Sequence, residues 1–160
     1  MNYFELFDIP VSFTIDRALL GKRLIALQKK YHPDFYGQGS EDERAEALEM
    51  SSLANAGYKV LQNEEATIKY LLQLHGLLEE EEKYQLPPDF LMVVMELNEM
   101  KMDGADTAAI QQEVSRLLQE IKAEVQPVLD HYDAQTAPAA LQKVKEWYFK
   151  KKYLDRLLAD

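Results

Sequence analysis

The run Tyr31-His32-Pro33-Asp34 constrains the fold of this chain more than any other stretch, because its proline sets where the preceding helix ends. The apolar residues before it recur at helical steps of three and four: Leu20, Leu24, Leu27 and Tyr31. A proline disfavours helical geometry at the residue before it, so the helix should stop at His32. Asp16 can cap its first turn by accepting from free amide groups. The pattern predicts a helix from about 16 to 31, followed by a polar loop.

The predicted helix carries a cluster of bases away from its apolar stripe. The cluster consists of Arg17, Lys22, Arg23, Lys29 and Lys30. Because the whole chain has a formal net charge of −10, a local positive surface is unusual in it. Such a surface can be an ordinary solvated helix face. It can also steer an acidic partner and raise the association rate, which is the interpretation we favour.

The composition excludes several classes of function. The acidic balance opposes nonspecific binding to nucleic acid or anionic lipid, since both are polyanions. Without cysteine the chain cannot form disulfides, a catalytic thiolate or a cysteine-based metal site. No apolar run approaches the length of a membrane span, and the first residues lack the pattern of a signal peptide. We therefore expect a soluble, cytoplasmic protein with no metal, cofactor, membrane or nucleic-acid partner.

Helical patterns cover nearly the whole sequence, and no strand pattern accompanies them. The expected segments are about two turns from Tyr3 that end before Pro10, and then 16–31, 41–62, 64–75, 89–102, 106–132 and 138–158. In the third segment, Leu53, Ala56 and Val60 form the face expected to pack on the Leu20 stripe. Pro127 should kink or split the sixth segment by removing one backbone hydrogen bond.

An acidic run and two prolines separate the helices into two groups. Glu79 to Glu82 and Pro87-Pro88 make residues 77–88 read as a solvated linker. The predicted fold is therefore all-α, with a helical hairpin plus short helices in residues 1–76 and a three-helix bundle in residues 89–160.

The amino-terminal part resembles a J-domain, the module that activates DnaK-type ATPase chaperones. In that family an invariant His-Pro-Asp loop follows a basic helix, and His32, Pro33 and Asp34 occupy those positions. The next residue is commonly basic in J-domains and is Phe35 here. The resemblance implies a chaperone-binding site made of the loop and the nearby bases: His32, Pro33, Asp34, Lys22, Arg23, Lys29 and Lys30.

The chain as a whole resembles the HscB family, J-type co-chaperones of iron–sulfur cluster assembly. Four stretches carry the resemblance: the opening Tyr-Phe-x-Leu-Phe, the His-Pro-Asp loop, the 70–76 segment ending His75-Gly76, and the 90–99 segment. The end of the chain, 152–157, is also similar to that family's last helix. The resemblance implies an HscA- or DnaK-type partner and a binding surface for an IscU-like scaffold protein. The residues implied for that surface are Leu91, Met92, Met95, Glu96, Glu99 and Tyr153.

Periodicity alone leaves the role of the 90–95 stretch open between core and interface. This stretch is apolar almost all round, which is more than one buried face requires. Core packing must take some of these side chains, and the excess, rich in methionine, suits an exposed contact patch. The family resemblance favours the interface. For Tyr153, a place in the core is nearly as good an interpretation.

Histidine chemistry offers a rival interpretation. His32 could act as a general base with Asp34, or bind a metal. However, His75 and His131 lack ligand spacing with His32, and no nucleophile or phosphate-binding motif accompanies the pair. We expect an adaptor without chemistry of its own, which stimulates the partner's ATPase and delivers the scaffold. The alternatives are a general J-protein with another client, or a small helical enzyme.

Overall fold

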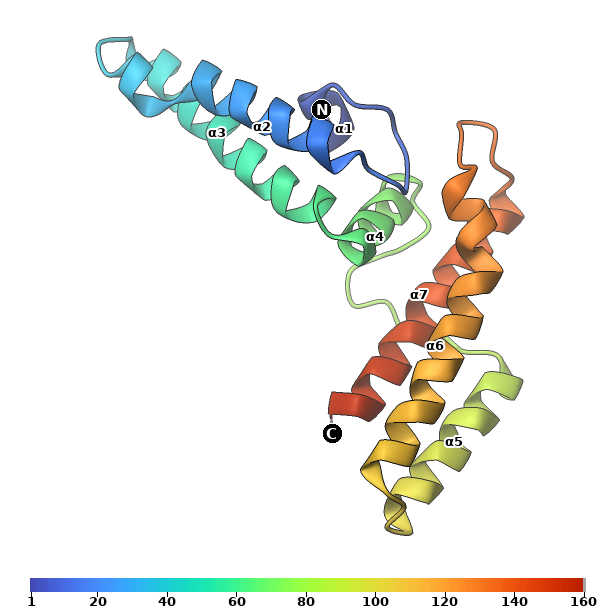
Figure 1. The fold of residues 1–160 in the computed structure, drawn as a ribbon. Coiled ribbons are helices and arrows are strands. Elements are labelled where there is room, and N and C mark those ends of the chain that lie inside the picture. Colours follow the sequence, from blue (N-terminus) through green and yellow to red (C-terminus); the bar gives the residue numbers. More distant parts are fainter. Residues whose placement is uncertain (160) are drawn as a thin grey trace. The chain divides into compact units, whose positions relative to one another are not determined.

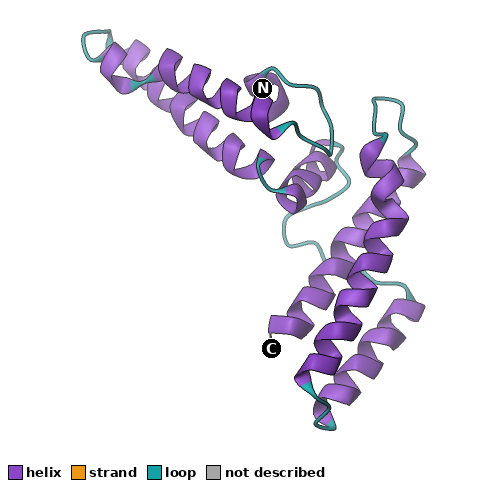
Figure 2. Cartoon of the chain, in the orientation of Figure 1, coloured by secondary structure: helices purple, strands orange, loops and turns teal. Residues whose placement is uncertain are grey.

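The computed structural model describes residues 1–159, and within that range every regular element is helical (Figure 2). The elements are α1 (Tyr3–Phe7), α2 (Arg17–Tyr31), the 3-10 helix η1 (Pro33–Tyr36), α3 (Glu41–Leu61), α4 (Glu64–Leu74), α5 (Pro88–Met102), α6 (Thr107–Asp130) and α7 (Pro138–Ala159) (Figure 1). The predicted all-α class is confirmed. The chain divides into two compact units, Met1–Leu71 and Leu72–Asp160, called unit 1 and unit 2 below.

Unit 1 is built on the α2–α3 hairpin, with α1 packed against both helices. As predicted, α2 stops at Tyr31, and the Asp16 carboxylate caps it by accepting from the Leu19 backbone N–H at 3.1 Å. Its core is formed mainly by large side chains that are almost fully buried: Phe4, Phe7, Phe13, Leu20, Leu61, Ile68 and Leu71. Burial of this kind contributes about 1.5–3 kcal/mol per large side chain, so it dominates the stability of a helix pair this small.

The inward face of α3 differs from the predicted one. Leu53 and Ala56 are exposed, and the buried residues are Ala47, Ala54, Gly57 and Leu61. At Gly57 the cause is the close approach of α1. A Cβ atom added at Gly57 would lie 2.8 Å from ring atoms of both Tyr3 and Phe7, closer than real contacts allow. Position 57 therefore accepts only a glycine, because the aromatic rings of α1 already fill the space beside it.

Unit 2 contains the α5, α6 and α7 bundle. The Lys150 ammonium lies 5.4 Å from the centre of the Phe90 ring, and the Lys101 ammonium donates to the Leu157 carbonyl at 3.2 Å. Because both pairs follow the same chain direction, α5 and α7 run parallel. The α6 helix continues through Pro127 to Asp130, so of the two predicted outcomes, a kink or a split, the split is wrong. Only one turn follows this exposed proline, and the His131 N–H bonds back to the Pro127 carbonyl at 3.1 Å.

The segment 77–88 packs onto α7 of unit 2. Leu78 and Leu86 are buried, and the Tyr84 ring stacks on Phe149 with centroids 4.6 Å apart. Glu79, Glu80 and Glu81 are exposed, as a solvated run would be, whereas a Glu82 carboxylate oxygen lies 2.8 Å from the Lys145 ammonium. The hydrogen bond from Lys145 lowers the pKa of Glu82 below its ordinary value. The segment 77–88, predicted from its charge to be a solvated linker, is therefore held on unit 2 by the buried side chains Leu78 and Leu86.

Candidate functional site

The His-Pro-Asp turn is held by its own side chains. His32 is extended, with φ −62° and ψ 132°, and Pro33 begins η1. The His32 Nδ1 atom accepts from the Asp34 backbone N–H at 3.2 Å, so the neutral ring carries its proton on Nε2. The Tyr36 hydroxyl donates to the Lys30 carbonyl at 3.0 Å, which satisfies a free acceptor at the end of α2. The turn is thus capped by local hydrogen bonds while the His32 and Asp34 side chains remain exposed.

The predicted bases of α2 fall into two groups around the helix. Lys22 and Lys29 are two turns apart and exposed, on the side of the helix that leads to His32. Arg23 and Lys30 lie about 100° further round. The Arg23 guanidinium is 3.8 Å from the Asp8 carboxylate, and the Lys30 ammonium is 5.2 Å from the centre of the Tyr31 ring. Lys22 and Lys29 are therefore better placed to meet a partner together with the turn.

A groove beside the turn includes residues that sequence reasoning missed. Its lining consists of Ile25, Gln28, Lys29, His32, Asp34 and Phe35. Ile25 and Phe35 are large, exposed apolar side chains, and the Phe35 ring lies edge-on to His32 with centroids 6.1 Å apart. The available signal was the position of Ile25, one helical step from Lys22 and Lys29 and outside the Leu20 stripe.

The α5 helix has apolar side chains on two opposite faces. Phe90, Val94 and Leu97 are buried in the bundle. Leu91, Met92 and Met95 lie outside the core, with relative exposures of 39%, 62% and 61%. The predicted acids Glu96 and Glu99 are exposed on the same outer side. This outer face, defined by Leu91, Met92, Met95, Glu96 and Glu99, is called the α5 face below. Packing of the bundle core does not use these apolar side chains, so they are available to contact a partner protein.

Two further residues bear on the α5 face. Met102 is almost fully exposed and extends the row of Leu91 and Met95 by two turns, a signal that the period of the helix could have provided. Tyr153 of α7 is partly exposed, and the Arg156 guanidinium lies 5.5 Å from its ring centre. It stands between Lys150 and Leu157 on the α7 ridge that borders α5, since those two residues make the contacts described above.

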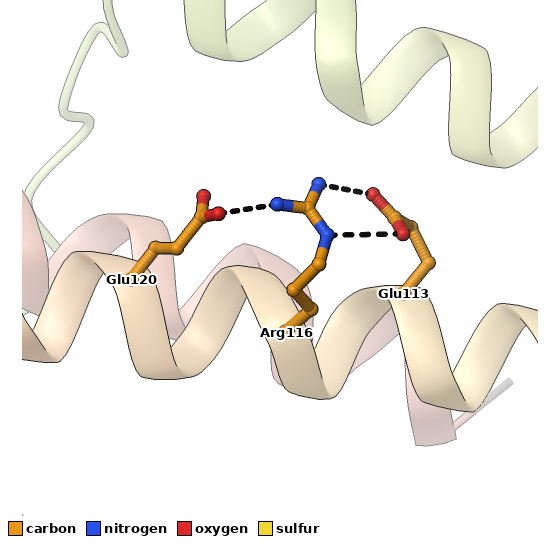
Figure 3. A network of polar contacts seen from close by, with 3 residues as sticks. All are labelled: Glu113, Arg116 and Glu120. Carbon is orange, nitrogen blue, oxygen red and sulfur yellow. Dashed lines mark hydrogen bonds and ion pairs between the residues drawn. The ribbon is translucent and has the colours of Figure 1, made fainter.

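Most bases near the bundle surface have intramolecular partners. Arg116 of α6 binds the carboxylates of Glu113 and Glu120 on the same helix (Figure 3), and its hydrogen bond lowers the pKa of Glu113. On α7, the Lys151 ammonium is 2.7 Å from the Asp155 carboxylate, and the Lys152 ammonium is 5.0 Å from the Tyr148 ring centre. Pairs of this kind stabilise helices modestly, so these bases are assigned to the stability of the bundle and not to partner binding.

Within residues 1–159, no group of three or more His, Cys, Asp or Glu side chains is arranged to hold a metal ion. His75 has another partner, since its Nε2 lies 2.7 Å from the Tyr132 hydroxyl. Over the same range, no helix has both the length and the apolar character needed to cross a membrane.

Comparison with known proteins identifies relatives over nearly the full chain. Residues 86–160 match the family model described as the HSCB C-terminal oligomerisation domain. The co-chaperone protein HscB homolog of Vibrio vulnificus is 35% identical over 157 residues, covering 93% of this chain and 90% of that protein. The human iron-sulfur cluster co-chaperone protein HscB is 32% identical, covering 98% of this chain and 65% of its own length. The solved structure of chaperone HscB from Vibrio cholerae aligns with a TM-score of 0.69 at 30% identity, over 99% of this chain and 94% of that one.

Proposed function

The chain belongs to the HscB family of co-chaperones, and we propose that it couples an ATPase chaperone to a scaffold protein in iron–sulfur cluster assembly. Unit 1, a J-domain, stimulates ATP hydrolysis by an HscA- or DnaK-type chaperone. Unit 2 holds an IscU-like scaffold protein on the α5 face and delivers it to the same chaperone. The co-chaperone supplies no catalytic group, because the ATPase residues belong to its partner.

The observation that carries this proposal is the exposed His-Pro-Asp turn, capped by its own side chains beside Lys29, with Lys22 two turns further back on α2. A preformed loop loses little conformational entropy on docking, so its exposed side chains can contribute to affinity. The neighbouring ammonium groups attract an acidic surface and raise the association rate. Ile25 and Phe35 add apolar contact area in the groove.

The α5 face supports the scaffold-binding half of the proposal. Leu91, Met92 and Met95 form an apolar centre with Glu96 and Glu99 along it, which is the anatomy of a protein interface. Flexible methionines adapt to the shape of a partner. A matching scaffold surface would present apolar groups together with basic side chains. Tyr153 is the proposed contribution from α7.

Two docking surfaces on one chain give the coupling its physical basis. A scaffold bound to unit 2 meets the chaperone at a raised effective concentration, because the same chain holds both. Hydrolysis stimulated by unit 1 then occurs while the scaffold is at hand. In this mechanism the chaperone contacts the scaffold only by binding it as a client.

Steady-state ATP hydrolysis by an HscA-type chaperone tests the proposal. We expect the chain to raise the basal rate, and the chain with an IscU-like scaffold to raise it by more than the two separate increments. Failure to stimulate would contradict the J-domain role. Stimulation of the chaperone with no measurable scaffold binding in calorimetry would favour a general J-protein with another client.

A further inference from the structure

The oxidisable sulfur of this chain is concentrated on one helix. The sequence has six methionines and no cysteine, and four of the six lie on α5: Met92, Met95, Met100 and Met102. All four side chains are more than a third exposed. The remaining two are Met1, also exposed, and Met50, which is half-buried on α3. Thioether oxidation of the folded chain is therefore directed mainly to the helix that carries the α5 face.

Exposure makes these thioethers reachable without unfolding. The α5 helix keeps its place through Phe90, Val94 and Leu97, none of which contains sulfur. A peroxide can attack Met92 and Met95 from solvent while the buried side of the helix stays packed. Oxidation there changes the chemistry of the outer surface and leaves the bundle core unaltered.

We propose that reversible oxidation of Met92 and Met95 to methionine sulfoxide switches off scaffold binding at the α5 face, an inference that rests on the proposed function. The oxidant is a hydroperoxide. The thioether sulfur attacks one peroxide oxygen, the O–O bond breaks, an S–O bond forms, and water or an alcohol leaves. Sulfur loses two electrons and the peroxide gains them. Methionine sulfoxide reductases reverse the step with electrons from thiols.

The loss of affinity follows from what a sulfoxide adds. Its oxygen is a strong acceptor placed at the apolar centre of the contact, where the facing scaffold groups are apolar and the basic ones are taken up by Glu96 and Glu99, so it would be buried without a donor. The neighbouring Glu96 and Glu99 side chains offer carboxylates, which at neutral pH are further acceptors and cannot pair with it. Each sulfoxide should therefore weaken scaffold binding by about tenfold. Such a switch would pause scaffold delivery during peroxide stress and restore it on repair.

The first measurement follows the oxidation itself and requires no partner. The whole chain is treated with hydrogen peroxide, and sulfoxides are mapped by peptide mass spectrometry over time. We expect Met92, Met95 and Met102 to oxidise well before Met50. The midpoint of thermal unfolding should shift by no more than a few degrees. Faster oxidation of Met50 than of Met92 and Met95, or loss of the folded state, would overturn the proposal.

The second measurement is calorimetric titration with an IscU-like scaffold before oxidation, after it, and after treatment with methionine sulfoxide reductases of both stereospecificities. The double variant Met92→Leu, Met95→Leu keeps the face apolar and should bind the scaffold equally before and after peroxide. The matched variant Met50→Leu, Met100→Leu removes the same number of sulfurs away from the α5 face and should lose binding after peroxide treatment as the wild type does.

The outcomes separate this inference from the proposed function. Scaffold binding that drops after oxidation, recovers with the reductases and is protected only by the 92/95 double variant supports it. Wild-type binding that survives full conversion of Met92 and Met95 overturns the switch and leaves the proposed function intact. Absence of scaffold binding before any oxidation overturns both.

Discussion

At the scale of single residues, His32 combines a structural contact with an exposed surface. Its Nδ1 accepts from the Asp34 backbone and holds the turn, while about half of the side chain is open to solvent. A replacement that keeps an acceptor but changes the ring can therefore separate folding from docking.

We predict that His32→Gln abolishes stimulation of the chaperone ATPase and leaves folding nearly unchanged. The glutamine amide oxygen can still accept a hydrogen bond, and exposed substitutions usually change stability by about 0.5 kcal/mol or less. The measurements are ATP turnover and thermal unfolding by circular dichroism. His131→Gln, at the exposed end of α6, is the matched control and should stimulate normally. Full stimulation of the chaperone ATPase by the His32→Gln protein would contradict a role of His32 in docking.

Gly57 illustrates how one missing side chain admits a whole helix. We predict that Gly57→Val destabilises the chain by about 1–3 kcal/mol, because its side chain would overlap Tyr3 and Phe7. Gly21 of α2 has no atom within 4 Å of an added Cβ, so Gly21→Ala should stabilise by about 0.5–1 kcal/mol through helix propensity. Urea unfolding of the two variants checks both signs. Equal stabilities would show that α1 does not pack on Gly57 in solution.

At the scale of helices, α2 presents its bases in two directions. We predict that Lys29→Glu slows association with the chaperone by about threefold to tenfold, while Arg23→Glu has a smaller effect. Lys29 lines the groove beside His32, whereas the Arg23 guanidinium lies close to Asp8 within the fold. Stopped-flow association at several salt concentrations provides the measurement, since screening should reduce the Lys29 effect. An association rate that changes with neither the substitutions nor the salt concentration would mean that the bases are only a solvated helix face.

The α5 helix makes the sharpest distinction between surface and core. We predict that Leu91→Ala, Met92→Ala and Met95→Ala together weaken scaffold binding by roughly a hundredfold or more, because central interface side chains contribute about 1–2 kcal/mol each. Folding should change little, since these side chains lie outside the core. Leu97→Ala, on the buried side of the same helix, should instead lower the free energy of unfolding by about 2–5 kcal/mol. Calorimetry and thermal unfolding read both effects, and normal scaffold binding by the triple variant would refute the interface.

At the scale of the whole molecule, the two candidate surfaces lie on separate compact units. The His-Pro-Asp turn belongs to unit 1 and the α5 face to unit 2. Neither unit alone would bring a scaffold and an ATPase chaperone together. Their covalent connection is therefore part of the proposed mechanism.

We predict that a mixture of His32→Gln protein and the α5 triple-alanine protein does not restore the scaffold-dependent part of ATPase stimulation. Each protein retains one working surface, but a surface in trans gives no gain in effective concentration. The triple-alanine protein alone should still raise the basal ATPase rate through unit 1. Recovery of wild-type synergy in the mixture would mean that the two surfaces act independently.

The helices and the turn could be predicted from the sequence, because both depend on interactions between residues close along the chain. Side-chain period predicted the all-α fold, Asp16 and Pro33 marked the ends of α2, and the His-Pro-Asp turn is held by groups within a few residues of one another. Whether α6 continues past Pro127 was not predicted, because sequence patterns locate a helix end only to within a residue or two.

The tertiary structure alone decided which faces are buried. On α3, the rings of α1 leave room only for a glycine at position 57, and Leu53 is exposed although it is more hydrophobic. On α5, helical periodicity does not distinguish the two apolar faces. Only the packing of α6 and α7 shows that one face is buried and that Leu91, Met92 and Met95 lie outside the core. Leu78 and Leu86 join the core of unit 2 from within a charged segment. Burial is settled by neighbours distant in sequence, and periodicity contains no information about which neighbours those are.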